Sequence, residues 1–416
     1  MRIAHFIHRY PPARGGSEAY LQRLSRFLAQ HGHTVSVWTT NALDLEAFWS
    51  RQGRTLAKGE EWDGSVRVQR FGLSRWPGRG RMLRALACLP GEQWKWITDH
   101  FGPMSFPMWW RAGRPADQFD LVHALVFPWP WHIVCARRLA RRQGIPFLIT
   151  PFLHLGDPEH PDDETRRQFA TPIMRSLLQS ADRVFVQTSL ERAGAIELGV
   201  EEARIVVQGL GVDAAECTGG NRARARAQWN VLDDEVVVGH LANLCVEKGS
   251  TDLLQAAAML WKKGSRFRVV LAGTQALNFQ LFWEQFENKE LVVLAGSLDE
   301  QQKRDFFAGI DLFVLPSRSD SFGLVLLEAW ANGLANIAYR AGGVAEVIHH
   351  DEDGILIRCG DLEALAGSIQ QLIEKPELRQ RLGNRGRERT QREFGWADKL
   401  RLVEQVYEEV VRGGKG

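Results

Sequence analysis

The feature that most constrains the fold of this chain is a regular alternation of short apolar runs with amphipathic stretches. Residues 2–8 form an apolar run, residues 10–18 form a turn-rich segment with two adjacent glycines, and residues 34–38 form a second apolar run. Between them, apolar residues recur at the spacing of one helix face, at Leu21, Leu24, Phe27 and Leu28. This order of strand, loop, helix and strand predicts a βαβ unit and therefore a parallel sheet.

The alternation continues in two consecutive series. The first series contains further predicted strands, at residues 121–123, 146–150, 183–187 and 205–207. After a break near residues 215–229, the second series contains predicted strands at residues 236–240, 268–271, 292–294, 312–315 and 336–338. Two such series predict an α/β protein of two Rossmann-like domains that face each other across a cleft. We place the domains at residues 1–214 and 215–395, followed by a final helix and tail at residues 396–416.

Composition excludes several classes of protein. The chain has 416 residues with 52 basic and 50 acidic side chains, and this near balance argues against general affinity for nucleic acid. No run reaches the ~18 apolar residues that a membrane span needs, and the apolar stretch before Arg9 is too short for a signal peptide. The five cysteines include no C-x-x-C pair, so we expect reduced thiols in a cytoplasmic protein, without a disulfide framework or zinc site.

The segment of residues 312–333 most strongly suggests a ligand site. A predicted strand ends at Pro316, a polar loop with Asp320 follows, and a helix that contains Glu328 is predicted to begin near Phe322. Ligands of open α/β sheets bind at such strand ends, where a helix N-terminus presents free N–H groups. On a helix the two carboxylates would be about 12 Å apart, too far to share one proton transfer. Either they contact two ends of one elongated ligand, or Asp320 is a helix cap and Glu328 a surface charge.

Three other loops at predicted strand ends carry candidate residues. Lys248 lies beside a glycine between a strand and a helix, where a lysine suits either a phosphate group or a solvated turn. Gly15 and Gly16 either admit a phosphate close to the backbone or form a plain tight turn. His154 either faces the cleft as a hydrogen-bonding or proton-handling group or is structural. We interpret the acidic residues 351–353 as a turn and assign no metal ligand.

In this order along the chain, these segments resemble the family 4 retaining glycosyltransferases of GT-B fold (glycosyl transferases group 1), which transfer a sugar from a nucleotide donor. The resemblance extends over essentially the whole chain. It rests on the ordered combination of six segments, at residues 15–16, 180–189, 208–213, 247–249, 318–328 and 340–347. It implies that the final helix crosses back to the N-terminal domain.

The resemblance also implies roles for the residues at the donor sugar. Glu328 matches the acidic residue that holds the ribose hydroxyls of the donor. Asp320 matches the acidic residue that contacts the transferred sugar, together with the backbone of Phe322, Gly323 and Leu324.

Other roles that the resemblance implies concern the diphosphate and the sugar. Lys248 matches the lysine that steadies the diphosphate, which Gly15 and Gly16 would approach from the other domain. His154 matches a cleft histidine near the sugar. Asn243 stands where the family often has arginine, which removes one of the two cations expected at the diphosphate.

Two further positions depart from the family pattern. Asp320 stands where glutamate is usual, so its carboxylate sits one methylene further back, and Ala335-Asn336 replaces a usual Pro-Val.

The implied activity is transfer of a hexosyl group, with retention, from a UDP- or GDP-sugar to a carbohydrate or lipid-linked acceptor. Fixed hydrogen-bond donors and a cation would stabilise the departing diphosphate without a metal or other cofactor. Two alternatives share the fold: a nucleotide-sugar-binding protein without catalysis, which the asparagine at position 243 motivates, and a nucleotide-sugar epimerase.

Charge is distributed unevenly over the predicted domains. Residues 1–214 carry 27 basic and 21 acidic side chains, and the remaining residues carry 25 and 29. Residues 64–115, which we interpret as an irregular insert, contain nine basic and two acidic residues interleaved with five tryptophans. The insert is either a solvated basic face with tryptophans in the core, or a patch that contacts the acceptor or an anionic membrane surface.

Overall fold

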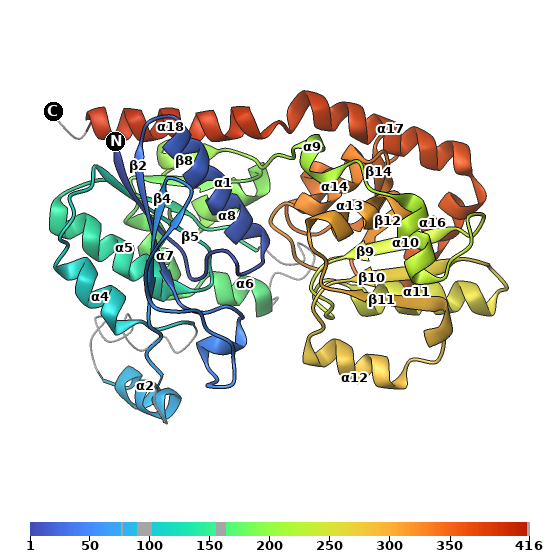
Figure 1. Cartoon of the computed structure of the whole chain (residues 1–416), viewed down its shortest axis with the longest axis horizontal. Helices are drawn as coiled ribbons and strands as arrows, with labels where there is room; N and C mark the ends of the chain where they lie inside the picture. Colours follow the sequence, from blue (N-terminus) through green and yellow to red (C-terminus); the bar gives the residue numbers. More distant parts are fainter. Residues whose placement is uncertain (76–77, 90–101, 155–163, 414–416) are drawn as a thin grey trace.

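The computed structural model of the chain describes residues 1–75, 78–89, 102–154 and 164–413 (Figure 1). It contains two α/β domains, each built on its own sheet. The first sheet has the strand order β3-β4-β2-β1-β5-β6-β7-β8 and the second has the order β11-β10-β9-β12-β13-β14. The strand pairs are parallel, except for β3 with β4. The prediction of two Rossmann-like domains is confirmed.

The first domain follows the predicted alternation closely. Its strands are β1 (Arg2–Phe6), β2 (Thr34–Thr40), β3 (Gly59–Asp63), β4 (Val66–Phe71), β5 (Leu121–Leu125), β6 (Phe147–Thr150), β7 (Arg183–Val186) and β8 (Ile205–Val207). Its helices are α1 (Gly16–Gln30), α2 (Arg79–Ala87), α4 (Phe106–Gly113), α5 (Pro130–Gln143), α6 (Glu164–Phe169), α7 (Pro172–Gln179) and α8 (Ser189–Glu197), with short 3₁₀ turns at Glu46–Phe48 and Glu202–Arg204. The central strands are buried on both faces, which is why they read as apolar runs.

The second domain repeats the pattern. Its strands are β9 (Val237–Leu241), β10 (Arg268–Ala272), β11 (Val292–Gly296), β12 (Leu312–Leu315), β13 (Ala335–Tyr339) and β14 (Gly354–Ile357). The helices before and between them are α9 (Ala214–Cys217), α10 (Arg222–Trp229), α11 (Ser250–Lys262), α12 (Leu277–Gln285), α13 (Glu300–Gly309), α14 (Leu324–Ala331), α15 (Val344–Val347) and α16 (Leu362–Glu374), with a 3₁₀ turn at Lys289–Leu291.

The interpretation of residues 64–115 as an irregular insert is wrong for the described part, which contains β4, α2 and α4. Strand β4 belongs to the first sheet, where it pairs with both β2 and β3. Its side chains alternate between buried and partly exposed, with Val66 and Val68 in the core. The sequence pattern does not predict the antiparallel β3, because this strand is exposed over most of its length and rich in acidic residues. Trp76, Trp94, Lys95 and Trp96 lie outside the described residues.

Two long helices close the chain and join the domains. Helix α17 (Pro376–Glu393) covers the second domain, and α18 (Trp396–Gly413) continues in the same direction across the first (Figure 1). In α18, the buried Tyr407 hydroxyl lies 3.1 Å from His5 Nε2 and also bonds to His123 Nδ1, which come from β1 and β5. The predicted crossing of the final helix to the N-terminal domain is confirmed.

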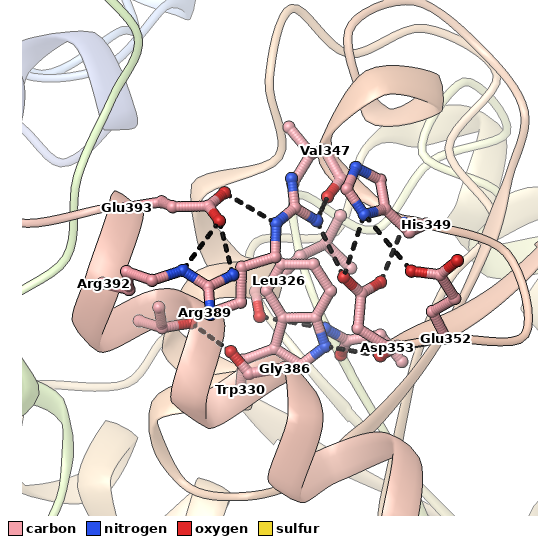
Figure 2. A network of polar contacts seen from close by, with 12 residues as sticks. Leu326, Trp330, Val347, His349, Glu352, Asp353, Gly386, Arg389, Arg392 and Glu393 are labelled. Carbon is pink, nitrogen blue, oxygen red and sulfur yellow. Dashed lines mark hydrogen bonds and ion pairs between the residues drawn. The ribbon is translucent and has the colours of Figure 1, made fainter.

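A polar network fixes α17 to the second domain (Figure 2). Arg389 Nη1 donates to Asp353 Oδ2 and to the Val347 carbonyl, both at 2.7 Å, and Trp330 Nε1 donates to the Asp353 carbonyl at 2.9 Å. Residues 351–353 form a turn, as predicted, and this turn is the docking point of α17.

Candidate functional site

The candidate residues lie at the carboxyl ends of strands near the centre of each sheet. In the second sheet β9 lies between β10 and β12, and in the first β1 lies between β2 and β5, so chain order reverses beside β9 and beside β1. Such reversal points are where doubly wound sheets bind ligands. Lys248 follows β9, Asp320 follows β12, and Gly15 and Gly16 follow β1. The topology therefore places the candidate residues at the expected ends of both sheets.

Lys248 and Asp320 form an ion pair. Lys248 Nζ lies 2.8 Å from Asp320 Oδ2 and donates to the Ser319 carbonyl at 3.2 Å. The other carboxylate oxygen of Asp320 accepts from the N–H groups of Gly323, at 2.9 Å, and Phe322, at 3.3 Å. Burial favours a raised pKa for Asp320, but the charge of Lys248 and the hydrogen bonds that the carboxylate accepts together oppose it, so the net effect lowers the pKa and the carboxylate is ionised. Asp320 therefore caps the loop before α14 and also carries a negative charge into the site.

His154 reaches this pair from the first domain. Its Nδ1 lies 3.2 Å from Ser319 Oγ, and its ring stacks on Phe169 with the centroids 5.0 Å apart. Burial, together with the charge of Lys248, lowers the pKa of His154 to about 4. The side chain is therefore a neutral imidazole at neutral pH, able to exchange hydrogen bonds but not to supply a cation.

Glycines allow the loops of the second domain to pack backbone against backbone. Gly249 has a positive φ of 71°, and a Cβ added there would lie 1.8 Å from the Pro316 carbonyl oxygen. A Cβ on Gly342 would lie 2.2 Å from the Asp320 carbonyl oxygen. These contacts hold the loops that carry Lys248 and Asp320 against each other.

The glycine loop of the first domain faces α14 of the second. Gly16 is the first residue of α1, and a Cβ added there would lie 3.9 Å from Leu324 Cδ1. Gly15 precedes the helix with extended backbone. Asn243 is exposed in the loop after β9. The start of α1 and the start of α14 thus meet across the domain boundary.

Glu328 lies in a cavity between the domains. The cavity measures about 670 Å³, within the usual range for small-molecule sites, and is lined from α1, α13, α14 and the start of α18. The Glu328 side chain is 20% exposed and forms an ion pair with Lys303 of α13. Burial raises the pKa of Glu328, and Lys303 opposes this rise. The alternative that Glu328 is a simple surface charge is wrong.

Several residues at the domain boundary were not singled out by the sequence pattern. In the sequence, Lys303 of α13 cannot be distinguished from an ordinary solvent-exposed charged residue of a helix. Arg14 Nη1 donates across the boundary to the Leu298 carbonyl at 2.8 Å. Glu346, which lies in a segment that carried the family resemblance, accepts from the N–H groups of Ser189 and Leu190 at the start of α8. Two separate segments of the second domain, at Leu298 and Glu346, therefore contact the first.

No helix among the described residues is long and apolar enough to cross a membrane. Across the same residues, no group of three or more His, Cys, Asp and Glu side chains is placed to hold a metal ion.

Two curated relatives are similar to this chain. The N-acetyl-alpha-D-glucosaminyl L-malate synthase of Bacillus anthracis is 29% identical over 191 residues, which span 46% of this chain and half of that enzyme. The D-inositol 3-phosphate glycosyltransferase of Thermobifida fusca is 26% identical over 398 residues, which span 89% of this chain and 83% of that enzyme.

Two solved structures have a similar fold. The sucrose-phosphate synthase of Thermosynechococcus elongatus superposes with a TM-score of 0.76 at 22% identity, over 99% of each chain. Anabaena Alr3699/HepE in complex with UDP superposes with a TM-score of 0.71 at 18% identity, over 98% of this chain and all of that one. Both similarities extend over the two domains.

Two family models divide the chain between them. The model described as "Glycosyl transferase 4-like domain" matches residues 15–211, and the model described as "Glycosyl transferases group 1" matches residues 221–389. The first match begins at the glycine loop, and the second includes Lys248, Asp320 and Glu328. With two Rossmann-like domains in the GT-B arrangement, the chain belongs to the group 1 glycosyltransferases, enzymes that use nucleotide-sugar donors.

Proposed function

We propose that this enzyme transfers a hexosyl group from a nucleoside-diphosphate sugar to a carbohydrate or lipid-linked acceptor, with retention of anomeric configuration and without a metal ion. The observation that carries the proposal is the Lys248–Asp320 pair, which lies at the strand ends of the second domain with His154 of the first domain beside it. A cation, a carboxylate and a neutral hydrogen-bonding group from two domains thus lie together at the domain boundary.

The diphosphate end of the donor would depend on Lys248. Departure of a nucleoside diphosphate develops negative charge on the phosphate oxygens, and a fixed ammonium group stabilises that charge without reorganisation. The N-terminus of α14 adds favourable backbone polarity beside it. Because Asn243 supplies an amide in place of a second cation, Lys248 would carry most of this stabilisation.

Retention would follow from attack on the same face that the leaving group departs from. The bond between the anomeric carbon and the phosphate oxygen breaks while a bond from the acceptor oxygen forms. The proton of the acceptor hydroxyl passes to the departing phosphate oxygen. Neutral His154 and ionised Asp320 would hold the sugar hydroxyls, a role that needs hydrogen bonds and no proton transfer from either side chain.

The nucleoside end would lie toward Glu328. A carboxylate can accept hydrogen bonds from both ribose hydroxyls, and its pairing with Lys303 holds it in place inside the cavity. HepE, which shares the fold, is solved with UDP and with UDP-glucose, which supports UDP-sugars as the first donors to examine.

The proposal is tested with a thermal-shift panel of UDP-, GDP- and ADP-sugars, followed by transfer assays with the sugar that raises Tm most. A true donor stabilises the folded chain by mass action. The proposal expects acceptor-dependent release of nucleotide. Donor turnover without an acceptor would instead indicate an epimerase, and binding without any turnover a protein that only binds nucleotide sugars.

A further inference from the structure

A pocket of about 600 Å³ lies between α4 and α5, far from the cleft. Both helices are at the edge of the first domain that faces away from the second (Figure 1). Described residues of both helices line it, at Trp109, Gly113, Val134, Arg137, Arg138, Arg141 and Arg142. None of these is acidic, so the pocket carries a concentrated positive charge.

The arginines occupy one side of α5 because its other side is buried. Arg138, Arg141 and Arg142 form no ion pair with any residue that the structure describes, in contrast to Arg67, which pairs with Asp117 at 2.6 Å. The Arg138 guanidinium stacks over the Trp109 ring at 3.7 Å, and its buried Nε lacks a hydrogen-bond partner within the described ranges. Among the described residues, no carboxylate therefore neutralises the charges of Arg138, Arg141 and Arg142.

Burial, with a smaller effect of the neighbouring charge of Arg141, lowers the pKa of Arg137. An anion placed in the pocket would form charge-assisted hydrogen bonds with Arg138, Arg141 and Arg142, because the planar guanidinium suits phosphate oxygens.

Several basic residues of the 64–115 segment are engaged by partners within the described part. Arg70 pairs with Glu61 and its side chain is 1% exposed, and Arg67 and Arg111 share Asp117. Arg75 and Arg79 donate to backbone carbonyls. The pocket therefore combines α4 of this segment with the arginines of α5, of which Arg141 and Arg142 are exposed.

Exposed aromatic side chains border the pocket. Phe106 is 42% exposed and Trp110 is 56% exposed, and they lie one turn apart on α4. Trp110 is about 100° around the helix from Trp109, which lines the pocket, and Arg114 stacks over the Trp110 ring at 4.0 Å. A small soluble anion would leave these rings in water, whereas the headgroup region of a bilayer favours aromatic rings beside arginines.

We propose that the surface formed by the pocket, Phe106 and Trp110, here the α4–α5 face, docks on an anionic phospholipid bilayer. Phosphate groups of the lipids would enter the arginine pocket, and the two aromatic side chains would lie at the headgroup boundary. This inference does not rest on the proposed transfer reaction, because the face is remote from the cleft.

The test is co-sedimentation of the full chain with vesicles of phosphatidylglycerol mixed with phosphatidylcholine, and with vesicles of phosphatidylcholine alone. We expect binding to the anionic vesicles that weakens with salt. Replacing both Arg141 and Arg142 by glutamine should lower the partition coefficient about 30-fold, which corresponds to about 1 kcal/mol per arginine near the membrane. Trp110→Ser should weaken the binding that remains at high salt.

The matched control replaces Arg381 and Arg385, two exposed arginines of α17, by glutamine, with the same change in net charge. It should bind anionic vesicles nearly as well as the unchanged chain. The proposal is overturned if the chain ignores anionic vesicles at low salt, if both double variants lose binding equally, or if inorganic pyrophosphate binds the pocket while vesicles do not. Donor-induced thermal shifts should be the same in all variants, which separates this test from that of the proposed function.

Discussion

At the scale of single residues, the charge of Lys248 acts on two neighbouring side chains in opposite domains. With the hydrogen bonds that Asp320 accepts, it opposes the effect of burial and lowers the pKa of that carboxyl group. At His154 it adds to the larger effect of burial, and both lower the pKa of the imidazole.

Lys248→Met should lower the rate of sugar transfer by well over tenfold without unfolding the protein. The variant keeps the length of the side chain but removes the charge that faces the departing diphosphate. Transfer rates and circular dichroism are measured beside Lys263→Met, an exposed lysine after α11. Near-normal transfer by Lys248→Met would remove this residue from the mechanism.

The ionisation of His154 should have no effect on the rate of sugar transfer at neutral pH. Because its pKa is about 4, the imidazole stays neutral from pH 6 to pH 8, and the transfer rate should show no step near pH 6.5 that depends on this residue. His154→Gln, which keeps a hydrogen-bonding side chain, should retain more activity than His154→Leu. A rate step near pH 6.5 that disappears in His154→Gln would show that the cationic form takes part.

The sequence could not predict which charged helix residues contribute to a site or pair with another residue. Lys248, Asp320 and Glu328 were recognisable because each follows a strand end or belongs to the family pattern. Lys303 and the arginines of α5 were not, because a charge on an exposed helix face gives the same sequence pattern whether it faces water, a ligand or a buried partner.

At the scale of secondary-structure elements, α17 and α18 hold the two domains in their relative position. The attachment of α17 depends on Arg389, which contacts the buried Asp353 beside Trp330 (Figure 2). The Arg389 guanidinium also lies over the Phe394 ring. The attachment of α18 depends on Tyr407 between two strands of the first sheet.

Arg389→Met should reduce the free energy of unfolding by about 3–5 kcal/mol, because it leaves the buried carboxylate of Asp353 without its charged partner. Arg392→Met, three residues along the same helix, removes a side chain that is 70% exposed and should cost no more than about 1 kcal/mol. Urea denaturation of both variants measures the difference. Equal losses would show that the network contributes little.

Element boundaries were predictable where strands are buried on both faces, as in β9, β10, β12 and β13. The hairpin of β3 and β4 was missed because it lies at the sheet edge, where strands need not be apolar. In β4, the buried Val66 and Val68 alternate with polar residues, which is a strand pattern. The neighbouring arginines obscured this pattern in the sequence.

At the scale of the whole molecule, buried imidazoles couple stability to pH. Burial lowers the pKa of six described histidines below 6.5, at His5, His8, His123, His132, His154 and His240. Burial raises the pKa of three carboxyl groups, at Glu191, Glu328 and Asp353, and these have the opposite effect. The six histidines outnumber these three carboxyl groups, so the effect of the histidines on the free energy of unfolding should dominate between pH 6.5 and 4.

Stability should therefore fall as pH drops from about 6.5 toward 4. In this range the unfolded chain binds protons on histidines that the folded chain keeps neutral, so each such histidine contributes up to about 1.4 kcal/mol per pH unit. Urea denaturation at pH 7, 6 and 5 measures the slope. A free energy of unfolding that stays constant or rises toward pH 5 would contradict the assignment of neutral buried imidazoles.

In the proposed reaction, one nucleotide sugar spans the cleft from Glu328 to the Lys248–Asp320 pair. Calorimetric titration of the best donor, and of its nucleoside diphosphate alone, tests this placement. Glu328→Gln should weaken both ligands by about tenfold, as expected for a lost charge-assisted hydrogen bond. Asp320→Asn should weaken the sugar-bearing donor more than the free nucleotide. Unchanged affinity for both ligands in both variants would contradict the claim.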